Sequence, residues 1–194
     1  MTRRAKVVSA LILAPGASAG RDQSALVAID ECLAAKGLRV ERIDFPYHLA
    51  GRRVPDRQPV LVATVAGAAR KLAAEMALAP EKIALGGRSM GGRMCSIAVA
   101  EGLGAAALVL VSYPLHPPGK PDKLRIDHLG AIKVPCLFVS GTRDAFATPE
   151  ELERATRAIA GPVTHVYVEG DHSLGRRDDE VAAIVADWVV ALSP

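Results

Sequence analysis

The sequence predicts an α/β domain built on a doubly wound, mostly parallel sheet of about six strands, flanked by helices. Short apolar, β-branched runs alternate with longer segments of helical periodicity from one end of the chain to the other. Four of the six runs are almost wholly apolar, as strands are when helices cover both of their faces. Alternation of this kind leads to right-handed crossovers and a sheet wound in both directions.

Each element can be placed from its pattern. The predicted strands are Lys6 to Leu13, Arg39 to Asp44, Lys82 to Leu85, Ala107 to Val111, Cys136 to Ser140 and Val163 to Glu169. The predicted helices are Ser24 to Lys36, Val60 to Leu78, Gly91 to Glu101, Pro149 to Ala160 and Asp179 to Ala191. The last helix has the clearest apolar stripe, so we expect it to dock on the sheet.

Several helix ends carry their own signals. Gly37 is expected to stop the first helix, and Pro80 to end the second. Thr148 is suited to the N-cap of the fourth helix, with Pro149 at its first position and Glu151 at its third.

Length and charge limit the classes of function. A chain of 194 residues fits one compact domain, and we expect residues 1–194 to form it. The formal net charge is +3, from 24 basic and 21 acidic residues, and the basic residues are scattered in short groups. We therefore expect no nucleic-acid partner, because no basic stripe or reading motif is present.

The cysteines indicate a reducing compartment. Cys32, Cys95 and Cys136 lie in a predicted helix, helix and strand, and their odd number argues against a full disulfide framework. We expect buried thiols and a cytoplasmic location.

The N-terminus has an alternative interpretation as an export signal. A basic stretch from Met1 to Lys6 precedes an apolar run, and Ala17-Ser18-Ala19 resembles a cleavage site. Cleavage there would remove the first strand, which the fold requires. No other run is long and apolar enough to predict a membrane span.

Ser89 is the candidate nucleophile. It lies in Gly87-Arg88-Ser89-Met90-Gly91, directly after the predicted strand Lys82 to Leu85 and at the start of a helix. In such a turn the serine is strained, and glycines two residues before and after it relieve crowding. The alternatives are an ordinary glycine-rich turn or a phosphate-binding turn, but neither Gly-x-Gly-x-x-Gly nor a Gly-Lys-Ser/Thr ending is present.

Position in the fold selects the general base. The histidines are His48, His116, His128, His165 and His172. His165 lies inside a predicted strand, and the other three candidates lie in loops or at their edges. His172 directly follows the last strand, at the carboxyl edge where ligands bind, and it fits the chain order nucleophile, acid, histidine.

The acid that orients this histidine is predicted to be Asp144. It follows the strand that lies between the other two in sequence. Asp171 is adjacent to the histidine and poorly placed to reach its ring, whereas Asp122 and Asp127 precede the strand. An acid that only caps the turn or pairs with Arg143 is the structural alternative.

Two backbone N–H groups are expected to form an oxyanion hole. Met90 follows the nucleophile at a helix start, where the amide is free. The second donor is predicted in the loop after the first strand, at Ala17, with Gly16 as second choice. Pro15 has no N–H to donate.

These residues resemble the α/β-hydrolase superfamily over nearly the whole chain. The runs Asp44-Phe45-Pro46-Tyr47, Tyr113-Pro114-Leu115-His116 and Ser140-Gly141-Thr142-Arg143-Asp144 are similar to short, lidless bacterial hydrolases near the dienelactone hydrolases. The resemblance implies a minimal fold without a cap domain and an open site. Pro15-Gly16 stands where relatives usually have His-Gly. Dienelactone hydrolases use a cysteine nucleophile, so Ser89 argues against transferring their lactone substrate.

The sequence therefore predicts a serine hydrolase, carboxylesterase-like, that cleaves a small or short-acyl ester through an acyl-enzyme. A thioesterase or peptidase would use the same triad, and a non-catalytic binding module on this fold is the alternative from another class. No metal or organic cofactor is implied. Arg88, beside the nucleophile, is a candidate contact for an anionic substrate, with a structural salt bridge as the competing role.

Overall fold

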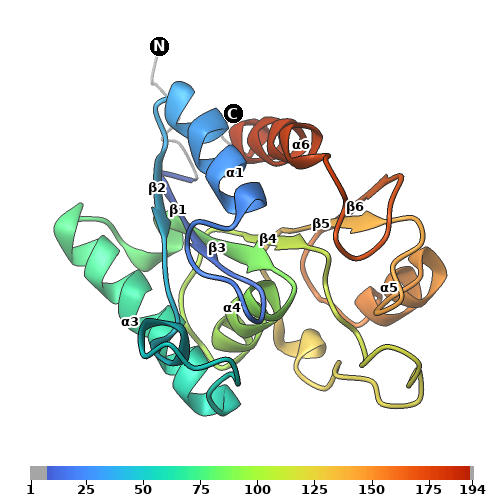
Figure 1. Cartoon of the computed structure of the whole chain (residues 1–194). Coiled ribbons are helices and arrows are strands. Elements are labelled where there is room, and N and C mark those ends of the chain that lie inside the picture. Colours follow the sequence, from blue (N-terminus) through green and yellow to red (C-terminus); the bar gives the residue numbers. More distant parts are fainter. Residues whose placement is uncertain (1–7, 193–194) are drawn as a thin grey trace.

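The computed structural model describes residues 8–192 and contains one sheet of six parallel strands in the order β2-β1-β3-β4-β5-β6 (Figure 1). The strands are β1 (Ala10–Ala14), β2 (Arg39–Arg42), β3 (Ile83–Arg88), β4 (Leu108–Val111), β5 (Cys136–Gly141) and β6 (Val163–Val168). The helices are α1 (Ser24–Ala35), α2 (Pro46–Leu49), α3 (Gln58–Glu75), α4 (Met90–Ala100), α5 (Pro149–Thr156) and α6 (Asp178–Ala191). Two short 3-10 helices are η1 (Pro80–Lys82) and η2 (Leu129–Ala131).

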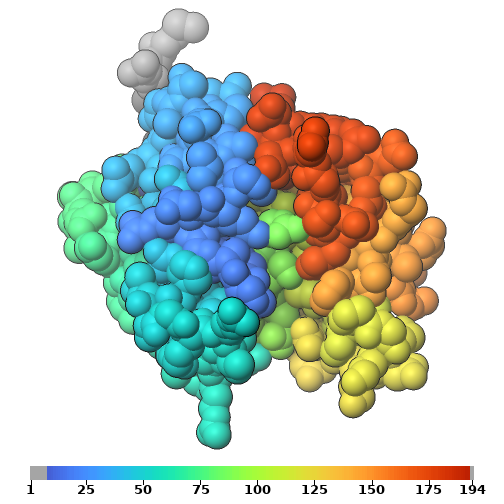
Figure 2. All heavy atoms as spheres, in the orientation of Figure 1, coloured from blue at the N-terminus to red at the C-terminus, as the bar shows by residue number. Residues whose placement is uncertain are grey.

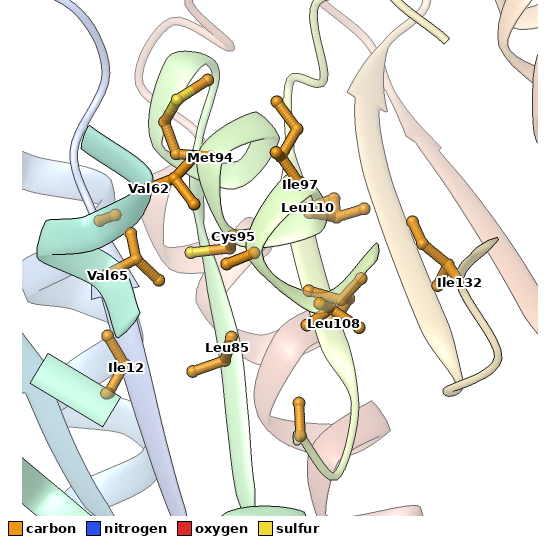
Figure 3. Close-up of a cluster of buried hydrophobic side chains, with 14 of the residues drawn as sticks. Ile12, Val62, Val65, Leu85, Met94, Cys95, Ile97, Leu108, Leu110 and Ile132 are labelled. Atoms are coloured by element: carbon orange, nitrogen blue, oxygen red, sulfur yellow. The ribbon is translucent and has the colours of Figure 1, made fainter. Parts of the chain in front are cut away.

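Helices cover both faces of the sheet, as predicted. Helices α1 and α6 lie together on one face, whereas α3 and α4 cover the other (Figure 1). Alternate residues of β1 face the two helix layers: Leu11 and Leu13 pack with α1 and α6, and Ile12 packs toward α3 and α4. Figure 3 shows the second layer, in which Ile12, Leu85 and Cys95 converge. This burial on both faces explains the continuous apolar runs in the sequence.

The winding direction reverses at β1. The chain passes from β1 to β2 on one side and then crosses to β3 on the other. The loops after β1 and β3 therefore diverge at a switch point, where a doubly wound sheet binds its ligand. The segment between β4 and β5 contains only the short helix η2 among its described elements, and it holds no cap domain.

Most boundaries agree with the sequence within a few residues, and two differ for structural reasons. Strand β3 extends to Arg88 because it pairs with β4 up to its last residue. Pro80 does not end the preceding helix. Helix α3 stops at Glu75, three residues before the predicted end at Leu78. Ala77 has a φ of 51°, and the Leu78 amide donates to the Ala73 carbonyl at 2.9 Å, which closes the helix.

Other end signals are confirmed. Gly37, with a φ of 76°, follows the end of α1. Thr148 and Glu151 form a reciprocal capping box at α5. The predicted first strand begins later than expected, at Ala10, and its first residues, Lys6 and Val7, lie outside the described residues. Within residues 8–192, no helix is long and apolar enough to cross a bilayer.

Candidate active site

Ser89 lies at the sharp turn between β3 and α4. Its backbone angles are φ 50° and ψ −117°, a conformation that L-residues rarely adopt and that costs about 1–3 kcal/mol. Two hydrogen bonds hold the turn: the Ser89 amide donates to the Val111 carbonyl at 2.8 Å, and the Arg93 amide donates to the Ser89 carbonyl at 3.1 Å. The strain is thus maintained by the sheet on one side and the helix on the other.

The two glycines around Ser89 allow this turn to pack against the loop after β1. A Cβ atom added to Gly87 or to Gly91 would collide with the Ala14 carbonyl. Ala14 also pairs with Gly87 in the β1–β3 ladder. Glycine is therefore required at both positions for steric reasons. The absence of a side chain lets the β1–α1 loop pack against the start of α4.

Three side chains from three loops meet at this turn. His172 Nε2 lies 2.8 Å from Ser89 Oγ, and His172 Nδ1 lies 2.8 and 2.9 Å from the two carboxylate oxygens of Asp144. Because an ionised carboxylate can only accept, Nδ1 carries the proton and Nε2 is left to accept the serine hydroxyl proton. The structure brings together all three residues that the sequence selected.

Asp144 is almost fully buried, with 2% of its surface exposed. The Phe146 amide donates to its Oδ1 at 2.8 Å, so the carboxylate faces an N–H group and the imidazole. The rival Asp171 is bonded to Ser173, through both the Ser173 amide at 2.8 Å and its hydroxyl at 2.6 Å. The adjacent acid is thus occupied within its own loop, as the sequence argument expected.

The backbone amides at the start of the loop after β1 differ in their partners. The Gly16 amide donates to Gln23 Oε1 at 3.0 Å, and the Ser18 amide donates to the Tyr47 hydroxyl at 3.2 Å. Ala17 lies between them, is exposed, and its amide has no partner within residues 8–192. Gly16, the second choice from sequence, is therefore engaged, and Ala17 is the candidate donor of this loop.

Met90 supplies the other candidate donor. It is the first residue of α4, where backbone N–H groups have no partner within the helix. The positive end of the helix dipole adds to the attraction for a negative oxygen at this point.

Arg88 forms none of the ion pairs found within residues 8–192, so the structural salt bridge considered from sequence is not observed. Its Nη2 donates to the His172 carbonyl at 2.9 Å, which ties the nucleophile strand to the histidine loop. Burial lowers the pKa of this guanidinium, while the charges of Asp178, Asp144 and Asp171 act in the opposite direction. Arg88 is therefore a bridge between loops whose charge is balanced by nearby carboxylates.

The remaining histidines have local partners. His165 contacts the Thr156 hydroxyl at 3.0 Å, and His128 contacts the Ser96 hydroxyl at 2.8 Å. His116 is buried, 2.8 Å from the Pro117 carbonyl, whereas His48 lies in α2, a helix the sequence had not indicated. Within residues 8–192, no group of three or more acidic, histidine or cysteine side chains is arranged to hold a metal ion.

The site opens directly to solvent. Figure 2 shows green atoms of the β3–α4 region at the surface, between the blue segment after β1 and the orange-red segment before α6. A small cavity of about 240 Å³ adjoins the loop after β1 and is lined by Ser18, His48, Gly51, Arg52 and Arg53.

The α/β-hydrolase class is defined by a parallel sheet wound in this order. Its members have a serine at a strained strand–helix turn and an acid–histidine pair on later loops. The family model described as an alpha/beta hydrolase domain matches residues 7–187, and the chain belongs to this family.

Solved structures agree on the fold. A hydrolase of the α/β superfamily from Xanthomonas campestris superposes with a TM-score of 0.71 at 22% identity, covering 94% of this chain and 99% of that one. A dienelactone hydrolase from Anabaena variabilis gives 0.74 at 19% identity, over 97% and 88%. The type II thioesterase BorB from the borrelidin biosynthetic cluster gives 0.69 at 17% identity, over 96% and 93%.

Sequence reasoning missed three residues around this site. Phe146 and Gln23 support the acid and the β1–α1 loop through contacts that no motif encodes. Arg93 follows Ser89 by one helical turn, and this spacing alone could have placed it near the nucleophile.

Proposed function

We propose that this protein is a serine hydrolase that cleaves a carboxylic ester through an acyl-enzyme intermediate. The observation that carries the proposal is the 2.8 Å contact between Ser89 Oγ and an imidazole whose other nitrogen faces the buried carboxylate of Asp144. A serine hydroxyl is a weak nucleophile, and a base held at this distance and in this tautomer is what activates it.

The acylation half of the reaction uses these residues in order. Ser89 Oγ attacks the ester carbonyl carbon while its proton passes to His172 Nε2, and the carbonyl oxygen becomes negative. Collapse of this intermediate breaks the bond to the alcohol, which takes the proton from Nε2. Asp144 stabilises the imidazolium between the two transfers.

Deacylation repeats the same steps with water. His172 takes a proton from the water as it attacks the acyl-Ser89 carbonyl, and then returns a proton to Ser89 Oγ as the carboxylic acid leaves. In both halves, the amides of Met90 and Ala17 stabilise the negative oxygen, an effect worth about 3–4 kcal/mol for each donor in related chemistry.

A thioester is the second candidate substrate, because the same groups would act on it and a type II thioesterase shares the fold. A peptide is the third candidate substrate, because its amine leaving group depends most on protonation. We also propose that the enzyme acts in the cytoplasm, since Cys95 and Cys136 are buried free thiols.

Labelling by a fluorophosphonate probe tests the nucleophile. The purified protein should be labelled, Ser89→Ala should not be, and the exposed Ser24→Ala should be labelled as the parent is. Equal labelling of Ser89→Ala would exclude the assignment.

Turnover of short p-nitrophenyl esters separates the enzyme from a binding module on the same fold. His172→Ala should lower kcat by about six orders of magnitude, as loss of the triad histidine does elsewhere. No turnover in the parent protein, with either esters or acyl thioesters, would favour the binding module.

A further inference from the structure

Arg93 is a half-buried cation without an acidic partner. Its Nε is buried and has no hydrogen-bond partner, while its Nη2 donates to Gln58 Oε1 at 3.1 Å. None of the ion pairs within residues 8–192 includes Arg93. A guanidinium removed from water without a counter-charge is costly, so its retention here calls for an explanation.

A second arginine lies close enough to act on it. The charge of Arg125 lowers the pKa of Arg93, in addition to the larger effect of burial, and only the Tyr113 hydroxyl acts in the opposite direction. Arg125 is partly buried and its amide is fixed to the Leu115 carbonyl at 2.8 Å. Asp127, two residues along, is exposed and pairs with neither arginine. Within residues 8–192, neither arginine thus forms an ion pair with a carboxylate.

The geometry of α4 directs Arg93 toward the nucleophile. The Arg93 amide donates to the Ser89 carbonyl, which places Arg93 one helical turn after the nucleophile. Long side chains on a helix lean toward its N-terminus, which here is the end that carries Ser89. We therefore expect the Arg93 side chain to lean toward the end of α4 that carries the nucleophile.

Arg88 provides the contrast that makes this arrangement informative. It directly precedes Ser89 in sequence, its guanidinium is bonded to the His172 carbonyl, and the charges of three carboxylates act on it. The same region of the protein therefore balances one arginine internally and leaves Arg93 with an unused donor.

We propose that Arg93 and Arg125 form a subsite for an anionic group, a carboxylate or a phosphate, carried by the ester substrate. The inference rests on the proposed hydrolase function and specifies its substrate class. Guanidinium donors bind the oxygens of such a group in pairs, and the bound anion would neutralise the cations.

Two probe esters of equal length test the subsite. Mono-p-nitrophenyl glutarate presents a carboxylate, and its methyl ester presents a neutral end. The parent protein should favour the anionic ester in kcat/KM by about tenfold at low salt, and added salt should reduce this ratio because it screens exposed charges. A ratio of one or less, with both esters hydrolysed, would overturn the subsite and leave the hydrolase intact.

Variants locate the effect within the molecule. Arg93→Gln should bring the ratio close to one, Arg125→Gln should lower it about threefold, and Arg93→Lys should lie between, since lysine keeps the charge but loses the planar fork. The matched control is Arg70→Gln, which removes the same charge from an exposed position on α3 and should keep the parent ratio. An equal loss of the ratio in Arg70→Gln would attribute the preference to net charge and contradict the proposal.

A binding measurement separates the two proposals and the two ligand chemistries. Free glutarate or inorganic phosphate, whichever the subsite prefers, should raise the melting temperature of the parent and not of Arg93→Gln. This shift without any ester turnover would support the anion subsite and reject the hydrolase. Ester turnover with neither a shift in melting temperature nor a preference for the anionic ester would support the hydrolase and reject the anion subsite.

Discussion

The ring of Phe146 lies against the imidazole of His172, with centroids 4.0 Å apart and planes inclined by 28°. The same residue donates its amide to Asp144 Oδ1, and its carbonyl accepts the amides of Leu115 and His116. Phe146 thus joins the acid, the histidine and the loop after β4. Its ring face is suited to the imidazolium that forms during the reaction, because an aromatic face attracts a cation.

We predict that Phe146→Ala lowers kcat/KM for a short ester by about tenfold, from lost positioning and lost cation–aromatic attraction. Phe146→Tyr should restore most of the activity, because it keeps the ring. Phe146→Leu should not, although it fills much of the space. Steady-state kinetics and the rate of fluorophosphonate labelling provide the measurement, and equal activity of the leucine and tyrosine variants would refute a role for the ring.

Gln23 is predicted to position the β1–α1 loop. Gln23→Ala removes the acceptor for the Gly16 amide, which should loosen the loop that presents Ala17 and lower kcat by about tenfold, a fraction of the effect of losing a donor outright. The loss in stability should be about 1 kcal/mol. Gln23→Glu keeps an acceptor oxygen and should recover activity; if it is as impaired as the alanine variant, the hydrogen bond is not the cause.

The elbow glycines should be intolerant of a methyl group for steric reasons. Gly91→Ala places a Cβ against the Ala14 carbonyl, and we expect a loss of about 3 kcal/mol or more in unfolding free energy. Gly67→Ala is the matched control, because a Cβ there meets no heavy atom within 4 Å and the residue lies inside α3.

This control variant should be more stable than the parent by about 0.5–1 kcal/mol, since alanine loses less backbone entropy in a helix. Urea unfolding of both variants gives the comparison. A stable, active Gly91→Ala would mean that β1 and α4 can separate without cost.

His128 is expected to make stability fall in mild acid. Burial and the charge of Arg93 lower its pKa from 6.5 to about 4. Between these values the unfolded chain binds more protons than the folded one, so stability present above pH 6.5 is lost as the pH falls toward 4. Since the imidazole is partly exposed, we expect the unfolding free energy to fall by about 1–2 kcal/mol, which is less than the full pKa shift would correspond to.

Urea unfolding at pH 7 and at pH 4.5 measures this loss. His128→Gln should be less stable at neutral pH, because the contacts to the Ser96 and Tyr113 hydroxyls change, but its stability should depend less on pH. An unchanged pH dependence in the variant would assign the effect to another group.

The sequence by itself determined the class of fold and the three residues that meet at the elbow. Apolar runs and helical periodicity report burial on one or two faces, which is a local property of each segment. The order of Ser89, Asp144 and His172 was readable because carboxyl ends of parallel strands converge at one edge, so position after a strand predicts proximity. The end of α3 at Glu75 was missed, because Ala77 has a positive φ, which an alanine in the sequence does not predict.

Only the tertiary structure decided which neighbours tune these residues. The hydrogen-bond partner of Arg88 depended on where the His172 loop placed its carbonyl, and the engagement of the Gly16 amide depended on the reach of Gln23. The uncompensated charge of Arg93 is likewise the outcome of packing between α3, α4 and the loop after β4. These contacts join residues far apart in the chain, and a local sequence pattern does not determine the spatial distance between such residues.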